Sequence, residues 1–188
     1  MGKWIVLVII AAAAIYVISV FNRLVRLRNL VREGWSGIDV QLKRRTDLVP
    51  NLVEAVKGYA AHERGVFEEV TAMRTSSIAA NNVSAQASAE QGLQASLGKL
   101  FAVAEAYPQL KADKNFLALQ QQLAEIEDQL QMARRYYNGT VRNLNTAIQS
   151  FPTNVLAGIF GFHEQPFFEL DDRSQAAAPS VAFQTPGS

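Results

Sequence analysis

The chain has 188 residues, the size of a single domain, and 18 Lys and Arg against 17 Asp and Glu leave a net charge of +1. This balance argues against a nucleic-acid-binding protein that works through a large basic field. The absence of cysteine excludes disulfide frameworks, Cys-ligated metal or iron–sulfur centres, cysteine nucleophiles and lipidated cysteine anchors. With only two histidines, few groups remain for metal or acid–base chemistry.

The most apolar stretch, Trp4–Phe21, contains no charged residue, glycine or proline. A helix of this length spans roughly 27 Å, close to the roughly 30 Å of a bilayer core. Lys3 fits the positive start of a cleaved signal peptide, but the apolar run is long and no small-x-small cleavage site follows it. We therefore expect residues 1–22 to be an uncleaved transmembrane anchor in the lipid bilayer.

The cations that flank the anchor are unequally distributed. Lys3 precedes it, and four juxtamembrane cations follow it: Arg23, Arg26, Arg28 and Arg32. Because segments rich in Lys and Arg are retained in the cytoplasm, this bias predicts an outside N-terminus and a cytoplasmic body. A periplasmic body is the alternative, and part of the arginine excess also fits a solvated face beside lipid headgroups.

Beyond the anchor, apolar residues recur at heptad spacing from Leu24 to Met73. The pattern predicts one long bundle helix that continues the anchor. Pro50 lies within it and predicts a kink rather than a break, because the heptad phase is the same on both sides. Three charged residues interrupt the seam: Arg28, Arg45 and Glu63.

Arg45 and Glu63 are roughly 27 Å apart on one helix and cannot pair with each other. A buried, unpaired charge costs several kcal/mol, so each must find a partner on another helix or reach solvent. We favour a structural role in setting helix register. A frayed seam and a binding site are the alternatives.

Residues 75–85 lose the periodicity and predict a connection. A second helix follows through Leu93–Tyr107 and is closed by Pro108. A third begins near Asp113, a plausible N-cap, and its uncharged seam continues to Phe151.

A shorter apolar element, Asn154–Phe162, predicts a short helix that folds back over the open end of the bundle. A surface patch for lipid or a partner protein is the alternative. Residues 171–188 have the composition of a disordered tail. Since no strand pattern appears, we expect an all-α fold. The transmembrane helix would be followed over residues 23–170 by an antiparallel up-and-down bundle of the four-helix type, with three long helices and one short one.

No sequence motif for catalysis or metal binding is present. Glu-x-x-His pairs, Gly-rich phosphate loops and Gly-x-Ser-x-Gly elbows are absent, and Val66 stands where an HExxH motif starting at His62 needs its second histidine. Glu125 and Glu127 flank the seam residue Ile126, so we expect both to be solvated. The sequence predicts no enzyme activity, no cofactor and no metal.

Several ordered blocks carry a family resemblance. They are residues 34–45 (GWSGIDVQLKRR), 47–53 (DLVPNLV), 56–63 (VKGYAAHE), 104–112 (AEAYPQLKA), 133–138 (ARRYYN), 151–154 (FPTN), 161–162 (GF) and 167–169 (FFE). Together they resemble the LemA family of bacterial membrane proteins. The resemblance implies an N-terminal transmembrane helix, a four-helix bundle and an outside N-terminus. It also implies an association with membrane-protein quality control or envelope remodelling, including genomic proximity to a membrane metalloprotease, and it supplies no catalytic residue.

The leading hypothesis is a non-enzymatic scaffold or adaptor, single-pass in the bacterial inner membrane, that forms a homo-oligomer or engages a membrane protease or other membrane protein. The alternative is a membrane-surface remodelling protein whose Phe-rich end and juxtamembrane arginines enter the headgroup region. An enzyme with an unrecognised site is a third hypothesis. The candidate interaction residues are Arg45, Asp47, Asn51, His62, Glu63, Phe160, Phe162, Phe167 and Phe168.

Overall fold

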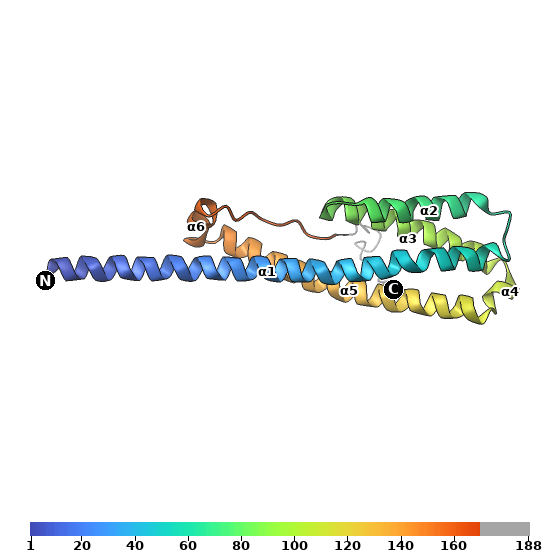
Figure 1. The fold of residues 1–188 in the computed structure, drawn as a ribbon, viewed down its shortest axis with the longest axis horizontal. Helices are drawn as coiled ribbons and strands as arrows, with labels where there is room; N and C mark the ends of the chain where they lie inside the picture. Colours follow the sequence, from blue (N-terminus) through green and yellow to red (C-terminus); the bar gives the residue numbers. More distant parts are fainter. Residues whose placement is uncertain (170–188) are drawn as a thin grey trace, which may run out of the picture.

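The protein is described here by a computed structural model that covers residues 1–169, so the tail predicted for 171–188 lies outside the described residues. Over that range the chain is helical and has no strand, which confirms the all-α fold. The helices are α1 (Gly2–Lys57), α2 (Arg64–Ala79), α3 (Val83–Glu105), α4 (Pro108–Lys111), α5 (Lys114–Gln149) and α6 (Thr153–Ile159). The second half of α1 runs up and down with α2, α3 and α5 as a four-helix bundle, and α4 is a single turn between α3 and α5 (Figure 1).

Helix α1 forms the axis of the molecule. Its 56 residues extend over roughly 84 Å, and its first part projects beyond the other helices (Figure 1). Within residues 1–169 it is the one helix that is long and apolar enough to cross a membrane, and only 6% of its apolar window is buried. The side chains of the predicted anchor therefore contact little of the chain itself.

Pro50 lies inside α1 and the helix continues through it, as predicted. Proline has no N–H, so the carbonyl of Thr46 loses its usual partner four residues later. Arg74 of α2 fills this vacancy, because its Nε donates to the Thr46 oxygen at 2.7 Å. The hydrogen bond that proline removes from α1 is thus replaced by one that joins α1 to α2.

The prediction of one helix through Met73 was wrong. α1 ends at Lys57, residues 58–63 turn the chain, and α2 returns antiparallel to α1 (Figure 1). Phe67 and Val70 still reach the core, but from α2. A heptad pattern reports which face of a segment is apolar, and it does not report a reversal of the chain when the phase happens to survive the turn.

The other predicted boundaries were partly correct. The connection expected over 75–85 is shorter, because α2 continues to Ala79 and α3 begins after Asn82, whose side chain accepts from the Ala85 amide at 2.8 Å. Pro108 begins α4 as well as following α3. Asp113 is the N-cap of α5 as predicted, accepting from two backbone amides at 2.9 Å.

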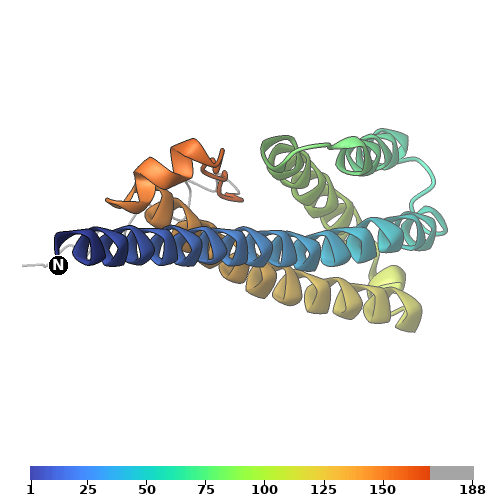
Figure 2. The ribbon, with the colours of Figure 1, turned by 60° about the vertical axis from the view of Figure 1, so that its left-hand side comes forward.

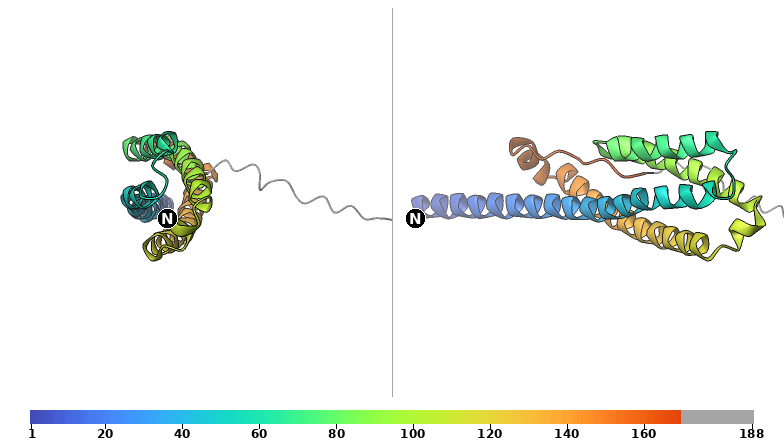
Figure 3. Two further views of the ribbon diagram at one scale, coloured as in Figure 1. Left: turned by 90° about the vertical axis from the view of Figure 1, so that its right-hand side faces the viewer. Right: turned by 45° about the vertical axis from the view of Figure 1, so that its right-hand side comes forward.

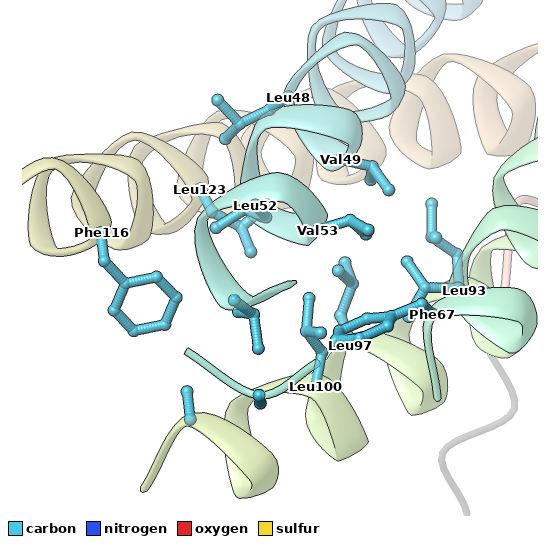
Figure 4. Close-up of a cluster of buried hydrophobic side chains, with 14 of the residues drawn as sticks. Leu48, Val49, Leu52, Val53, Phe67, Leu93, Leu97, Leu100, Phe116 and Leu123 are labelled. Carbon is cyan, nitrogen blue, oxygen red and sulfur yellow. The ribbon is translucent and has the colours of Figure 1, made fainter. Parts of the chain in front are cut away.

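The core has two parts. The distal cluster joins the C-terminal part of α1 to α2, α3, α4 and the start of α5, with Leu52, Leu97 and Phe116 among its members (Figure 4). The proximal cluster lies chiefly between the middle of α1 and the second half of α5. Gly34 allows these two helices to approach, since a Cβ there would lie 3.1 Å from the Cα of Tyr137.

Helix α6 confirms the short apolar helix predicted near Asn154–Phe162, and it packs against α1 and α5 where the free part of α1 begins (Figure 2). The chain then leaves α6 and runs back toward the middle of the bundle without regular structure (Figures 1 and 3). We call residues 160–169 the C-terminal strap.

Candidate interaction sites

Arg45 is buried in the middle of the bundle, with 1% of its surface exposed. Its Nη1 lies 3.0 Å from Glu90 of α3 and its Nη2 lies 2.8 Å from Glu127 of α5. Of the two outcomes expected for Arg45, a partner on another helix or contact with solvent, the structure shows the first, and two helices supply one partner each. Arg45 contributes nothing to the molecular surface and acts as an internal tie between α1, α3 and α5.

Glu90 is fully buried, and its carboxylate accepts from three side chains. Besides Arg45, the hydroxyl of Ser77 donates to it from α2, and Nε2 of Gln86 donates at 3.0 Å. Buried charges are tolerated when they are both paired and hydrogen-bonded, and this carboxylate meets both conditions. All four bundle helices therefore meet in one polar network.

The expectation that Glu127 is simply solvated was wrong. Its side chain is 32% exposed and pairs with Arg45, whereas Glu125 is exposed as expected. Burial raises the pKa of Glu127, and this effect exceeds the opposing attraction of Arg45; the nearby charge of Glu90 raises it further. Sequence analysis missed this residue because flanking a seam does not reveal which charge the neighbouring helix presents.

This pKa shift predicts a pH dependence of stability. A carboxyl group whose pKa is higher in the folded state favours folding while it is protonated, and this contribution is lost as the pH rises from about 4.5, its ordinary value. Glu127→Gln is therefore expected to flatten the fall in unfolding free energy above that pH. Urea unfolding of wild type and variant at several pH values measures the difference. Glu125→Gln, on the exposed side of α5, is the control and should leave the wild-type profile unchanged.

The C-terminal strap is held on α5 by two asparagine side chains. Asn145 accepts from the Gln165 amide and donates to the Gln165 carbonyl, both at 2.9 Å. Asn138, two turns earlier, makes the same pair of bonds with Phe168, at 2.9 and 3.2 Å. Each carboxamide thus satisfies both backbone groups of a residue in a segment without secondary structure, as buried backbone groups require.

Phe168 fixes the end of the strap. Its ring is 0% exposed, packs edge-on against Trp35 with centroids 5.7 Å apart, and lies 5.6 Å from the Arg134 guanidinium. Tyr137 adds a hydrogen bond from its hydroxyl to the Pro166 carbonyl at 2.9 Å. Phe168 is therefore part of the core, while its neighbour Phe167 is 39% exposed.

Aromatic side chains also gather at the membrane-proximal end. Phe21, the last residue of the apolar stretch, packs against Phe160 and Phe162 with centroids 5.1 and 5.9 Å apart. Phe162 is buried and carries the Arg28 guanidinium 5.1 Å above its ring, whereas Phe160 is 43% exposed. The structure thus brings the predicted Phe-rich end and one juxtamembrane arginine together.

The remaining juxtamembrane cations, Arg23, Arg26 and Arg32, are exposed on α1. They lie within ten residues of one another near the base of the bundle. No salt bridge within residues 1–169 includes any of them.

The other predicted interaction residues lie elsewhere. His62 is exposed and Glu63 is half-buried in the turn between α1 and α2, at the end of the bundle farthest from the anchor. Asp47 and Asn51 are exposed on α1, and Asp47 pairs with Lys43 at 3.4 Å. The candidate residues therefore form several separate surfaces rather than one site. Glu63 reaches solvent, which is one of the two outcomes expected for it.

A groove lies between α1 and the α2–α3 turn. Two adjoining hollows of about 260 and 390 Å³ share Asp39, Ala80 and Gln86 in their walls. Trp35 and Gln165 also line the second hollow. Within residues 1–169, no three acidic or histidine side chains come together in a way that could hold a metal ion.

A model of the "LemA family" matches residues 34–183, which is most of the chain. The chain belongs to the LemA family. The recognition from sequence blocks is therefore confirmed.

Among curated relatives, the chain is 26% identical over 175 residues to "Magnetosome protein MamQ 1" and "Magnetosome protein MamQ 2" of Paramagnetospirillum magneticum, covering 79% of this chain and 64% of each relative. It is 24% identical over 155 residues to "Protein LemA" of Metamycoplasma hominis, covering 80% of this chain and 69% of that protein. The match thus spans less than two thirds of the length of the MamQ proteins. The relatives and the apolar start of α1 indicate that this LemA family member is a membrane-associated protein.

Proposed function

We propose that this protein is a non-enzymatic scaffold that holds a four-helix bundle against a bacterial cytoplasmic membrane and associates there with itself or with other membrane proteins. The observation that carries the proposal is the continuity of α1, which is one helix from the apolar stretch to the far end of the bundle. Such a helix couples the bundle rigidly to its anchor. The buried charges Arg45 and Glu90 pair with each other inside the bundle, which supports a role in contact rather than chemistry.

The proposed orientation has the N-terminus outside and the bundle in the cytoplasm. It rests on the single cation before the apolar stretch and the four arginines after it. In this orientation the bundle would meet cytoplasmic parts of other membrane proteins, a membrane protease among them. A periplasmic bundle would replace these partners with periplasmic ones.

Self-association has a candidate surface on the α1–α5 pair. The helices are antiparallel, with Gly34 beside Tyr137 and Arg45 paired with Glu127, so Val40 lies at the level of Met132. Val40 is 53% and Met132 46% exposed. Each lies two residues from a buried residue of its own helix, Ile38 or Leu130, and so points away from the core, where an exposed apolar side chain is available to a second copy.

The test is chemical crosslinking of the full-length protein in nanodiscs, together with its mass by light scattering. We expect a defined oligomer, and we expect Val40→Arg/Met132→Arg to shift it toward monomer. Leu117→Arg is the matched control, since Leu117 is 47% exposed on α5 at the distal end. A strictly monomeric protein that captures no membrane protein in cells would refute the scaffold, and reporters fused to both termini test the orientation.

Membrane-surface remodelling is the second candidate. It is favoured by exposed apolar side chains on and beside α6, where Val155 is 54% and Ile159 71% exposed next to the aromatic contact with Phe21. Reconstituted vesicles separate the two functions. A remodelling protein changes vesicle diameter as its surface density increases, whereas a scaffold leaves the diameter unchanged.

A further inference from the structure

A hollow of about 610 Å³ lies at the membrane-proximal end of the molecule. One wall is α1, with Tyr16 and Arg23. The opposite wall is the last part of α5 and the start of α6, with Arg142, Ser150 and Phe151. The hollow therefore exists only because α5 folds back beside α1.

The position of the hollow along α1 sets its depth in a bilayer. Tyr16 belongs to the apolar stretch, and Arg23 follows the end of that stretch by two residues. The two are separated by roughly 10 Å along the helix axis. In the proposed orientation the hollow thus extends from the cytoplasmic side of the hydrocarbon core into the adjoining headgroup layer, and tyrosine and arginine are both favoured in this region.

The charge of the hollow has one sign. Arg23 and Arg142 supply two guanidinium groups from different helices, and no acidic residue is among the described residues that line it. Neither arginine forms a salt bridge within residues 1–169. Thr146 and Ser150 also line it, and the Ser150 hydroxyl donates to the Thr146 carbonyl at 2.6 Å. Two guanidinium groups that line one hollow are suited to phosphate oxygens.

The apolar side of the hollow faces the expected acyl region. Phe151 is 83% exposed and Tyr16 is 44% exposed. Helix α6 begins two residues after Phe151, at Thr153, and the strap that follows it contacts Phe21 at the end of the apolar stretch through Phe160. Large apolar side chains at this depth are covered by lipid rather than water.

We propose that this hollow binds one anionic phospholipid, with Arg23 and Arg142 contacting its phosphate and with Tyr16 and Phe151 lying against its acyl chains. This goes beyond the scaffold function, because it assigns a specific lipid site. Non-specific attraction between the juxtamembrane arginines and anionic lipid would require no such site. Arg142 distinguishes the two, since it lies on α5 rather than among the cations that follow the anchor.

The test is native mass spectrometry of the full-length protein in detergent with equal amounts of phosphatidylglycerol and phosphatidylcholine. We expect one phosphatidylglycerol to remain bound, and Arg23→Gln/Arg142→Gln to weaken this binding by roughly tenfold or more. Arg26→Gln/Arg135→Gln is the matched control. It removes the same charge from exposed positions on the same two helices that do not line the hollow. Arg23→Lys/Arg142→Lys should retain part of the preference.

Equal loss of phosphatidylglycerol from both glutamine pairs would overturn the proposal in favour of a diffuse electrostatic collar, and so would no loss from either. Complete displacement of the lipid by millimolar inorganic phosphate would also overturn it, because the acyl contacts would then contribute nothing. Circular dichroism of each variant confirms that the bundle is intact. The oligomeric state, read from the native mass spectra, tests the scaffold function separately.

Discussion

Arg45→Met is expected to lower the free energy of unfolding by about 3–5 kcal/mol, because it leaves Glu90 charged, fully buried and without its cation. Glu127 is affected less, since its partly exposed side chain can be hydrated. In a chain of this size the loss corresponds to a drop in Tm on the order of 10 °C. Thermal unfolding of the full-length protein in detergent, followed by circular dichroism, measures it.

Arg44→Met is the matched control. Arg44 is the preceding residue on α1, is exposed, and bonds only to Gln41 within the described residues. We expect its replacement to change stability by less than about 0.5 kcal/mol. Similar losses from the two substitutions would show that the buried network does not stabilise the fold as described.

The double variant Arg45→Met/Glu90→Gln distinguishes two causes of destabilisation. One is the loss of the ion pair between Arg45 and Glu90, and the other is the burial of an unpaired Glu90 carboxylate. Glutamine keeps an acceptor for the donors Ser77 and Gln86 while removing the negative charge. We therefore expect the double variant to regain most of the stability that Arg45→Met loses. Additive losses would contradict this account of the network.

Phe168→Ala is expected to release the C-terminal strap and to destabilise the protein by about 3 kcal/mol. This is the lower end of the range for removing a buried phenylalanine, because the strap can detach while the bundle stays folded. The most direct measurement is amide hydrogen exchange at residues 165 and 168, whose N–H groups donate to Asn145 and Asn138. Both amides should exchange faster, while amides in the middle of α5 should not.

Phe167→Ala is the control for this prediction, since the Phe167 ring is 39% exposed and adjacent in sequence. It should leave the exchange at both positions near the wild-type rate. Slow exchange in Phe168→Ala would mean that the hydrogen bonds from Asn138 and Asn145 alone hold the strap.

Much of the fold could be predicted because it depends on local patterns. The apolar stretch, the Asp113 cap and the tolerance of Pro50 follow from a few neighbouring residues each. The turn at 58–63 could not be predicted in the same way. The heptad phase continues across it, so in the sequence the buried residues of α2 look like a continuation of the apolar face of α1.

For the polar network, the sequence predicted only that Arg45 requires a partner, and not which residues supply it. A charge at the Arg45 seam position requires a partner, but Glu90 and Glu127 become its partners through the relative shift of three helices, which no single segment encodes. The contacts that hold the strap left no signal in the apolar pattern, because Asn138 and Asn145 bind the backbone of a segment without periodicity. Asn138 and Phe168 lie in two of the blocks that carry the family resemblance, but those blocks do not reveal that the two residues bind each other.

Because α1 extends far beyond the apolar stretch, a small tilt of the helix in the membrane displaces its far end by a large distance. From Phe21 to Lys57 the helix extends over roughly 54 Å, so a tilt of roughly 20° at the membrane carries the far turn sideways by roughly 18 Å. Tilt responds to the match between an apolar helix and bilayer thickness. A change of a few ångströms in bilayer thickness would thereby produce a much larger sideways displacement of His62 and its neighbours, which lie far from the lipid.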